Sequence, residues 1–562
     1  RSTLFPYTTL FRSQDEAEAV SLILRKVIEA PGKTAALVSP DRNLARRVAA
    51  RLETLGIVID DSAGRPLAKT PSGAFLDLVI SAFAEDFAPK ALMTLLKHPL
   101  LRLSLPVPVV RRAARALEVI AFRTLYLGRG LEGVSAALDA ARSEIAEKRR
   151  RERALLRLWD PDWEAARDLV VRLDVAYRPL AELVTRSEPV TLTAWASAHA
   201  AVADHLARTG ATTHEDQRAV TPATPEISPV WHEEAGSEAT KFFQSLALTE
   251  KVAPTMSARD YPEFYRGLVA GINVRPSGPV HPRISIWGPF EARLQQPDVV
   301  ILGSLNDGTW PEAADPGAWL NRPMRARLGL PSPEATIGQS AHDFISQLGA
   351  DQVFLTRAEK IDGEPKVPSR WLLRLLALAD GAGRADGVSG AELLRPAEPW
   401  LEWARARDDA PRPAAALPPA PKPALALRPR QLPVTAIERW LANPYAIYAR
   451  YVLKLESLPM LGVDPGAALR GQIIHEALGR FALRYPTELP EDIAGELIAA
   501  ANETMSAYAA HPRVAAFWLP RFERFARWFA DTEPARRPNV AIVDAEVEGF
   551  EMIEAPGGPF KV

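Results

Sequence analysis

A histidine flanked by two glycines is the strongest candidate for chemistry in this sequence. His475 has Gly471 four residues before it and Gly479 four residues after it, so all three share one strip of a helix. Glycines leave such a strip bare and let another group approach closely. A neutral imidazole that joins carboxylates can hold Mg²⁺ or Mn²⁺, ions that activate water for hydrolysis. A structural histidine is the alternative.

The carboxylates that such a metal site requires are not evident near His475. Glu546 and Glu548 follow an apolar run at 540–543 that is predicted to be a strand, which would place both on one face. One of them is a candidate outer member of the site, but exposure to solvent is the favoured interpretation.

The segment Gly32-Lys33-Thr34 is similar to the end of a phosphate-binding loop. That motif also needs a glycine five residues before the Gly-Lys pair, where this chain has Val27. It further needs a strand before the loop and a helix after it, whereas here a helix at 14–30 precedes and a strand at 35–38 follows. No other segment of the sequence fits this motif, so no ATP-binding loop is predicted.

Two basic runs are candidates for contact with phosphate groups. One is 148–151, and the other is the series Arg521, Arg524 and Arg527, which is interleaved with phenylalanines. Solvated helix faces in an arginine-rich chain have the same pattern, so both interpretations stay open.

Composition sets limits on cofactors and location. The chain has 562 residues, with 68 Lys+Arg against 69 Asp+Glu, and the balanced charge gives no bulk attraction to nucleic acid. It has 0 cysteines, which excludes disulfides and any iron–sulfur cluster held by this chain. No apolar run is long enough for a membrane span and no secretory signal is evident, so a cytoplasmic protein without membrane contact is expected.

The elements that position these residues predict an α/β fold of several domains. Strands are expected at 35–38, 57–59, 284–287, 299–302 and 353–355, with a long, mostly helical stretch between the second and third. An α/β domain made of 14–100 and 281–380 is therefore predicted, with 101–280 inserted as a helical domain. A Pro/Ala-rich linker is expected at 381–433, followed by a further domain at 434–562.

Three blocks in the α/β part resemble the helicase C-terminal region of UvrD-type helicases, and more closely AddB-type subunits of AddAB helicase–nucleases. They begin at 36–45, continue at 287–311 with Trp-Gly-Pro-Phe-Glu and Asn-Asp-Gly-Thr-Trp-Pro, and end with Thr-Arg-Ala at 356–358. The resemblance implies a degenerate RecA-like domain split by the helical insertion. It also implies that Arg357 belongs to a nucleotide site. Because no phosphate-binding loop is present, the preferred interpretation is that Arg357 pairs with a carboxylate at the end of a strand.

The last domain resembles the RecB-type branch of PD-(D/E)XK nucleases through Gly471-x3-His475-x2-Leu478. The resemblance implies that His475 is a catalytic metal ligand for Mg²⁺. The family's later catalytic strands, with their Asp and Asp-x-Lys residues, do not occur, so this copy is expected to be inactive alone. Asn443 stands where cluster-bearing relatives have a cysteine, which implies a domain without an iron–sulfur cluster.

The resemblance also implies the biological setting. It predicts a subunit of an ATP-dependent helicase–nuclease that processes double-strand DNA breaks, with an AddA-type partner that binds ATP, and with duplex ends and single-stranded DNA as substrates. A non-catalytic DNA-end-scanning scaffold with a dead nuclease fold is the alternative, and a helical interaction protein unrelated to DNA is a third hypothesis. Residues 1–13 resemble a translated adapter tail, and the chain is expected to be a fragment.

Overall fold

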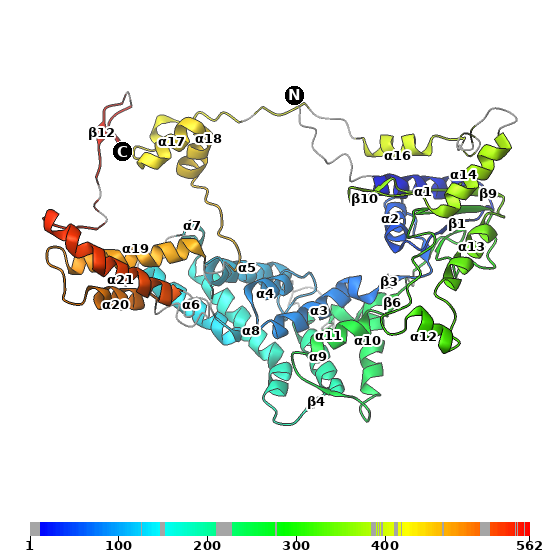
Figure 1. Cartoon of the computed structure of the whole chain (residues 1–562), viewed down its shortest axis with the longest axis horizontal. Coiled ribbons are helices and arrows are strands. Elements are labelled where there is room, and N and C mark those ends of the chain that lie inside the picture. The colour runs from blue at the N-terminus through cyan, green and yellow to red at the C-terminus, as the bar shows by residue number, and fades with distance from the viewer. Residues whose placement is uncertain are drawn as a thin grey trace, which may run out of the picture. The chain divides into compact units, whose positions relative to one another are not determined.

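The chain forms two compact units, which are considered separately. Unit 1 comprises residues 1–67 with 271–415, and unit 2 comprises 68–270 with 416–562. Figure 1 labels their elements. The computed structural model describes residues 12–124, 126, 128–146, 152–209, 228–275, 278–383, 389, 392, 394, 397–409, 414–417, 419–462, 466–505, 518–545, 547, 549–555 and 557–562. Among these residues, no helix combines the length and the apolar character needed to cross a membrane.

Unit 1 is built on a five-stranded sheet with the order β2-β7-β1-β8-β9, and all its pairings are parallel. The strands are β1 (Ala35–Val38), β2 (Asp60–Asp61), β7 (Ile284–Trp287), β8 (Val299–Leu302) and β9 (Gln352–Leu355). Leu37 lies opposite both Ile286 and Ile301. The expected parallel α/β sheet is thus confirmed, and strands far apart in the sequence meet in it.

Helices cover both faces of this sheet (Figure 1). Ala35 and Leu37 of β1 pack with α1 (Arg12–Glu29) and α2 (Arg42–Glu53), whereas Ala36 and Val38 pack with α13 (Ala335–Gln347) and α14 (Arg370–Gly383). Because alternate residues point to opposite faces, a strand covered on both sides must be apolar throughout, and β1 and β8 are fully buried.

Two local expectations for unit 1 are wrong. Residues 57–59 are not a strand; only Ile59 there is buried, and the chain reaches the sheet at β2. The second concerns residues 400–408, inside the expected linker at 381–433. Arg12 and Ser13, from the stretch that resembles an adapter tail, open α1, and Ser13 is buried and hydrogen-bonded to Arg47.

A helix, α16 (Trp400–Asp408), occupies part of the expected linker at 381–433. Its Trp400 is 7% exposed and packs in the same core as α1 and α2. Arg407 lies 2.9 Å from Glu18, a carboxylate on α1 whose side chain is fully buried and also lies 3.1 Å from Arg51. Burial of Trp400 and the ion pairs of the buried Glu18 carboxylate with Arg407 and Arg51 thus hold this helix on the sheet domain.

A two-stranded ribbon marks the point where the chain leaves the sheet and returns. β3 (Arg65–Pro66) pairs antiparallel with β6 (Asn273–Val274), and the Leu67 amide donates to the Ile272 carbonyl at 2.8 Å. The units therefore divide at 67/68 and 270/271, rather than at the expected 100/101 and 280/281. The helices α3 (Pro71–Ala84) and α4 (Pro89–Leu96) pack with other helices of unit 2.

The segment 68–270 of unit 2 is helical. Its other main helices are α5 (Val107–Leu117), α6 (Gly130–Ala146), α8 (Asp160–Val184), α9 (Leu192–Ala207), α10 (Glu233–Ala247) and α11 (Tyr261–Val269). His199 is fully buried among α3, α9 and α11, and its ring nitrogens lie 2.8 Å from the Leu76 carbonyl and 3.0 Å from the Tyr261 hydroxyl. Both ring nitrogens are thus satisfied, as burial of a polar group requires.

The segment from 431 onward contains two small clusters of elements. The first packs α17 (Val434–Ala442) and α18 (Pro444–Ile447) against Phe560 of the hairpin β12 (Met552–Ile553) and β13 (Phe560–Lys561). The second is formed by α19 (Ala467–Arg484), α20 (Ile493–Met505) and α21 (Leu519–Arg536). Ile473, Ala477 and Phe481, which recur every four residues along α19, are buried in its core.

The remaining described elements are short. They are η2 (Leu67–Lys69), η3 (Glu118–Phe122), α7 (Arg153–Leu156), β4 (Val190–Thr191), η4 (Pro229–Trp231), β5 (Thr255–Met256), α12 (Arg322–Arg327), β10 (Lys360–Ile361), β11 (Glu364–Pro365), η5 (Leu425–Leu427), η6 (Tyr448–Val452) and η9 (Arg537–Asn539).

Candidate functional site

The carboxyl ends of the parallel strands in unit 1 gather a cluster of polar side chains, at the edge where open α/β sheets bind ligands. Its centre is Glu16 of α1, which is 6% exposed. One carboxylate oxygen of Glu16 accepts hydrogen bonds from the Ser304 amide at 2.8 Å and from the Thr356 hydroxyl at 2.7 Å. The Ser304 hydroxyl donates to Asp41 at 2.7 Å, so groups following β1, β8 and β9 converge on this point.

Arg357 lies beside this cluster and is half-buried. Its guanidinium donates to the carbonyls of Ala358 at 3.3 Å and Lys366 at 3.4 Å. Its positive charge also lowers the pKa of Glu16. These contacts hold the Arg357 side chain at the strand end through backbone carbonyls.

The Gly-Lys-Thr segment does not form a phosphate-binding loop. It lies between α1 and β1, with the helix before it and the strand after it. The amide and the hydroxyl of Thr34 both donate to Asp298 at 2.7 Å, so they tie β1 to the start of β8. The Thr34 amide and hydroxyl, which would face a phosphate in such a loop, are therefore already hydrogen-bonded within the sheet.

Glu16 predicts a pH-dependent stability. Burial raises the pKa of Glu16 from 4.5 to about 6; the nearby Asp41 also raises it, and the Ser304 and Thr356 bonds and Arg357 lower it. Because the folded pKa lies above the unfolded one, the stabilisation is complete below pH 4.5 and is lost as the pH rises through about 6. Glu16→Gln should therefore raise the free energy of unfolding at pH 8 by roughly 1–2 kcal/mol.

Thermal unfolding followed by circular dichroism between pH 4 and pH 8 tests this prediction. The glutamine carbonyl can accept both hydrogen bonds, so the variant isolates the charge. Glu29→Gln, an exposed change on the same helix, is the control. Parallel pH profiles for the wild type and Glu16→Gln would show that the carboxyl does not titrate in this range.

We also predict that the purified chain has no ATPase activity, since the sequence has no phosphate-binding loop and Thr34 is bonded to Asp298. Phosphate release measured with and without DNA should stay at the background of a buffer control. Turnover that survives purification and is lost in Arg357→Ala would contradict this prediction and assign Arg357 to an active nucleotide site.

His475 lies on the exposed side of α19. A Cβ added to Gly471 would meet no atom within 4 Å, and one added to Gly479 would meet only the Cβ of Ala545 at 4.0 Å. The glycine strip is therefore bare, as expected, and the chain beyond α21 passes it at Gly479.

The described residues do not complete a metal site. No three histidine or acidic side chains among them are grouped so that they could hold an ion. Glu476, the acidic neighbour of His475, is paired with Arg480 at 2.7 Å. Residues 540–543 are not a strand, so that expectation is wrong, and Glu546 and Glu548 lie outside the described residues. The side chains described here do not by themselves fit Mg²⁺.

Asn443, which stands in place of a cluster-ligating cysteine, caps a helix instead. Its side-chain oxygen accepts from the Ala446 amide at 3.3 Å at the start of α18. Asparagine is among the preferred residues at this position because its oxygen satisfies an amide that the helix leaves unbonded. The following Tyr445 and Tyr448 contact each other, with ring centroids 5.9 Å apart.

Sequence reasoning missed Glu16 as a member of the sheet-edge cluster. A signal was present, because Glu16 lies four residues before the buried Val20 and eight before the buried Leu24. That spacing places a carboxylate on the apolar face of α1. A charged residue at such a position is buried only with partners, and here the partners come from distant strands.

Comparison with known proteins identifies the class of the last domain. Residues 431–560 match the PD-(D/E)XK nuclease superfamily. In the structure the two ends of this region meet, since the Leu432 amide donates to the Lys561 carbonyl at 3.1 Å. The chain thus contains a PD-(D/E)XK nuclease superfamily domain, close to the expected 434–562.

Part of the chain is similar to uncharacterized proteins of Rickettsia. It is 23% identical to one from Rickettsia felis over 349 residues, 23% identical to one from Rickettsia bellii over 343, and 22% identical to one from Rickettsia conorii over 345. Each match covers 60% of this chain and 39% of the relative.

Proposed function

We propose that the whole protein is an AddB-like subunit of an ATP-dependent helicase–nuclease that processes double-strand DNA breaks for recombinational repair. The observation that carries the proposal is the PD-(D/E)XK match at 431–560, within which His475 lies on a bare strip of α19. Members of this superfamily are generally nucleases, so hydrolysis of phosphodiester bonds is the activity that the domain supports best.

The sheet of unit 1 supports the helicase part of the proposal. Its parallel strands, the helices inserted between β3 and β6, and the Thr-Arg-Ala run after β9 are what a degenerate RecA-like helicase domain requires. We assign the motor to an AddA-type partner that binds ATP, because this chain has no phosphate-binding loop. Arg357 is then a vestige of a nucleotide site, and the complex acts in the cytoplasm on duplex ends and single-stranded DNA.

The Mg²⁺ of the proposed nuclease would be held by His475 together with carboxylates that the described residues do not supply. The alternative is a non-catalytic subunit that scans DNA ends with a dead nuclease fold. The two functions differ in a single observable, which is phosphodiester cleavage at DNA ends.

Cleavage of an end-labelled linear duplex by the full-length protein with its partner tests the proposal. The nuclease function predicts labelled fragments that require Mg²⁺ and are abolished by EDTA. Binding of ends without fragments, in the presence of a nuclease-dead partner subunit, would establish the scaffold function instead. Failure to bind DNA ends at all would contradict both.

A further inference from the structure

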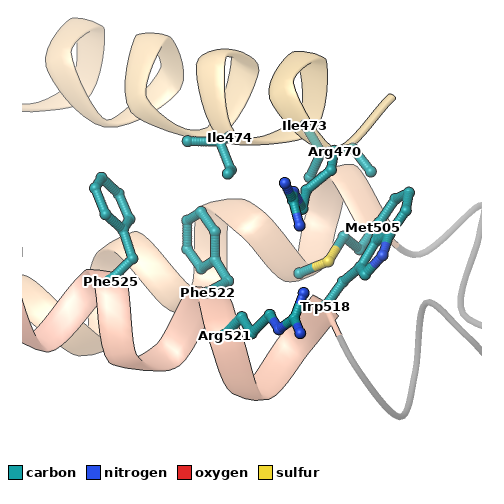
Figure 2. A pocket seen from close by; sticks show the side chains of 8 residues that line it. All are labelled: Arg470, Ile473, Ile474, Met505, Trp518, Arg521, Phe522 and Phe525. Carbon is teal, nitrogen blue, oxygen red and sulfur yellow. The ribbon is translucent and has the colours of Figure 1, made fainter. Parts of the chain in front are cut away.

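A pocket of about 300 Å³ lies between α19, α20 and α21 (Figure 2), and His475 is not among the residues that line it. Its lining consists of apolar side chains and two arginines: Arg470, Ile473, Ile474, Met505, Trp518, Arg521, Phe522 and Phe525. The volume is at the lower end of the range for pockets that bind small ligands.

The apolar part of the pocket is largely aromatic. Phe522 and Phe525 of α21 point toward Ile474 of α19, and Trp518 lies at the start of α21 beside Met505 (Figure 2). Phe522 is buried, whereas Trp518 and Phe525 are half-buried, so their rings are held by the helix core but remain accessible. Such rings can stack on any planar group of suitable size.

The charged part of the pocket is entirely cationic. Arg470 extends from α19 and Arg521 from α21 toward the same space (Figure 2). Within the described part of the chain, neither has an ion-pair partner, although Arg480 and Arg484 farther along α19 are paired with acidic residues. Two guanidinium groups that converge without a carboxylate favour an anion between them.

We propose that this pocket binds one nucleotide of single-stranded DNA, with the base against Trp518 and Phe522 and its phosphate between Arg470 and Arg521. The inference rests on the proposed nuclease function and adds a substrate contact outside the strip of His475. A base can enter an aromatic pocket only when it is unstacked, so a single strand is favoured over a duplex. Arginine also suits this role because it binds phosphate in a planar, two-point geometry.

The test is fluorescence anisotropy of a labelled oligothymidylate with the complete 562-residue chain. Arg521→Ala should weaken binding about fivefold or more, and should reduce the slope of log affinity against log salt by about 0.7, the value for one lost phosphate contact on a single strand. Arg470→Ala should do the same. Arg524→Ala removes an equal charge from the same helix but not from the pocket, and should change the affinity by less than about twofold.

A second variant pair separates stacking from folding. Trp518→Phe keeps a ring and should retain most of the affinity, whereas Trp518→Leu should lose about fivefold or more, because stacking contributes on the order of 1–3 kcal/mol per base. Unchanged circular dichroism melting curves for both show that the helices remain packed. A duplex of the same length is the comparison ligand and should bind more weakly.

The outcomes distinguish this pocket from the nuclease proposal. Equal effects of Arg521→Ala and Arg524→Ala would overturn the pocket, even if the full-length protein cuts DNA. Loss of single-strand binding in the pocket variants supports the pocket, even if the full-length protein proves to be a scaffold. Absence of oligonucleotide binding by the wild-type chain, or preferential binding of the duplex, would also overturn it.

Discussion

Replacing His475 by alanine in a cleavage-competent, full-length form of the protein is expected to reduce DNA cleavage on the order of 100-fold or more, with little loss of DNA binding. A metal ligand acts on the chemical step, and even the partners that only orient such ligands contribute about 10–100-fold. The exposed position of His475 on α19 means that its removal leaves no cavity in the helix core. Retained DNA binding by the variant then assigns the loss of cleavage to the chemical step.

The measurement compares cleavage rates at saturating DNA with binding affinities, for the wild type, His475→Ala and Gln472→Ala. Gln472 is exposed on the same helix, so its change controls for a general effect on α19. A Mn²⁺ titration by calorimetry adds a readout that does not depend on cleavage, and His475→Ala should bind the ion more weakly. Equal cleavage by the wild type and His475→Ala would return His475 to a structural role.

The 562-residue chain itself is expected not to cut DNA in Mg²⁺ or Mn²⁺, because its sequence has no Asp-x-Lys strand of the family type and its described residues form no three-ligand group. Hard divalent ions need several oxygen ligands, and one imidazole does not hold them. Metal-dependent nicking by highly purified chain, lost in His475→Ala, would show that the missing carboxylates come from elsewhere in this sequence.

Trp310→Ala is expected to destabilise unit 1 by about 3–5 kcal/mol, the usual range for removal of a fully buried tryptophan. Trp310 has no exposed surface, packs against Phe344 of α13, and donates from Nε1 to the Gly303 carbonyl at 3.1 Å. The ring therefore joins the loop after β8 to a covering helix. Its removal leaves a cavity that the surrounding strands cannot close.

Urea unfolding followed by near-ultraviolet circular dichroism measures this effect. Trp319→Ala is the matched control, since that side chain is 92% exposed and should contribute within about 0.5 kcal/mol. Trp310→Phe should lie between them, at about 1–2 kcal/mol, because the Gly303 carbonyl still accepts from the Ser39 hydroxyl at 2.9 Å. Equal midpoints for Trp310→Ala and Trp319→Ala would contradict the packing described for this core.

Much of the fold could be predicted from local pattern. The apolar runs at 35–38 and 299–302 identified strands buried on both faces, and the spacing of Ile473, Ala477 and Phe481 identified the inner face of α19. The local sequence pattern failed to predict elements that are buried by residues far away in the sequence. Residues 400–408 follow a polar stretch and precede prolines, yet the contacts of Trp400 and Arg407 with α1 hold them as a helix.

The sequence by itself determined which chemistries are possible: 0 cysteines exclude a cluster held by this chain, Val27 excludes a phosphate-binding loop, and two glycines leave His475 on a bare strip. Only the tertiary structure decided which side chains meet. Glu16 is bonded to Ser304 and Thr356, 288 and 340 residues away, and Arg470 and Arg521 enter one pocket from separate helices. The physical reason is that residue type and spacing set local conformation and charge. Burial, pKa and convergence arise when elements far apart in the chain pack together.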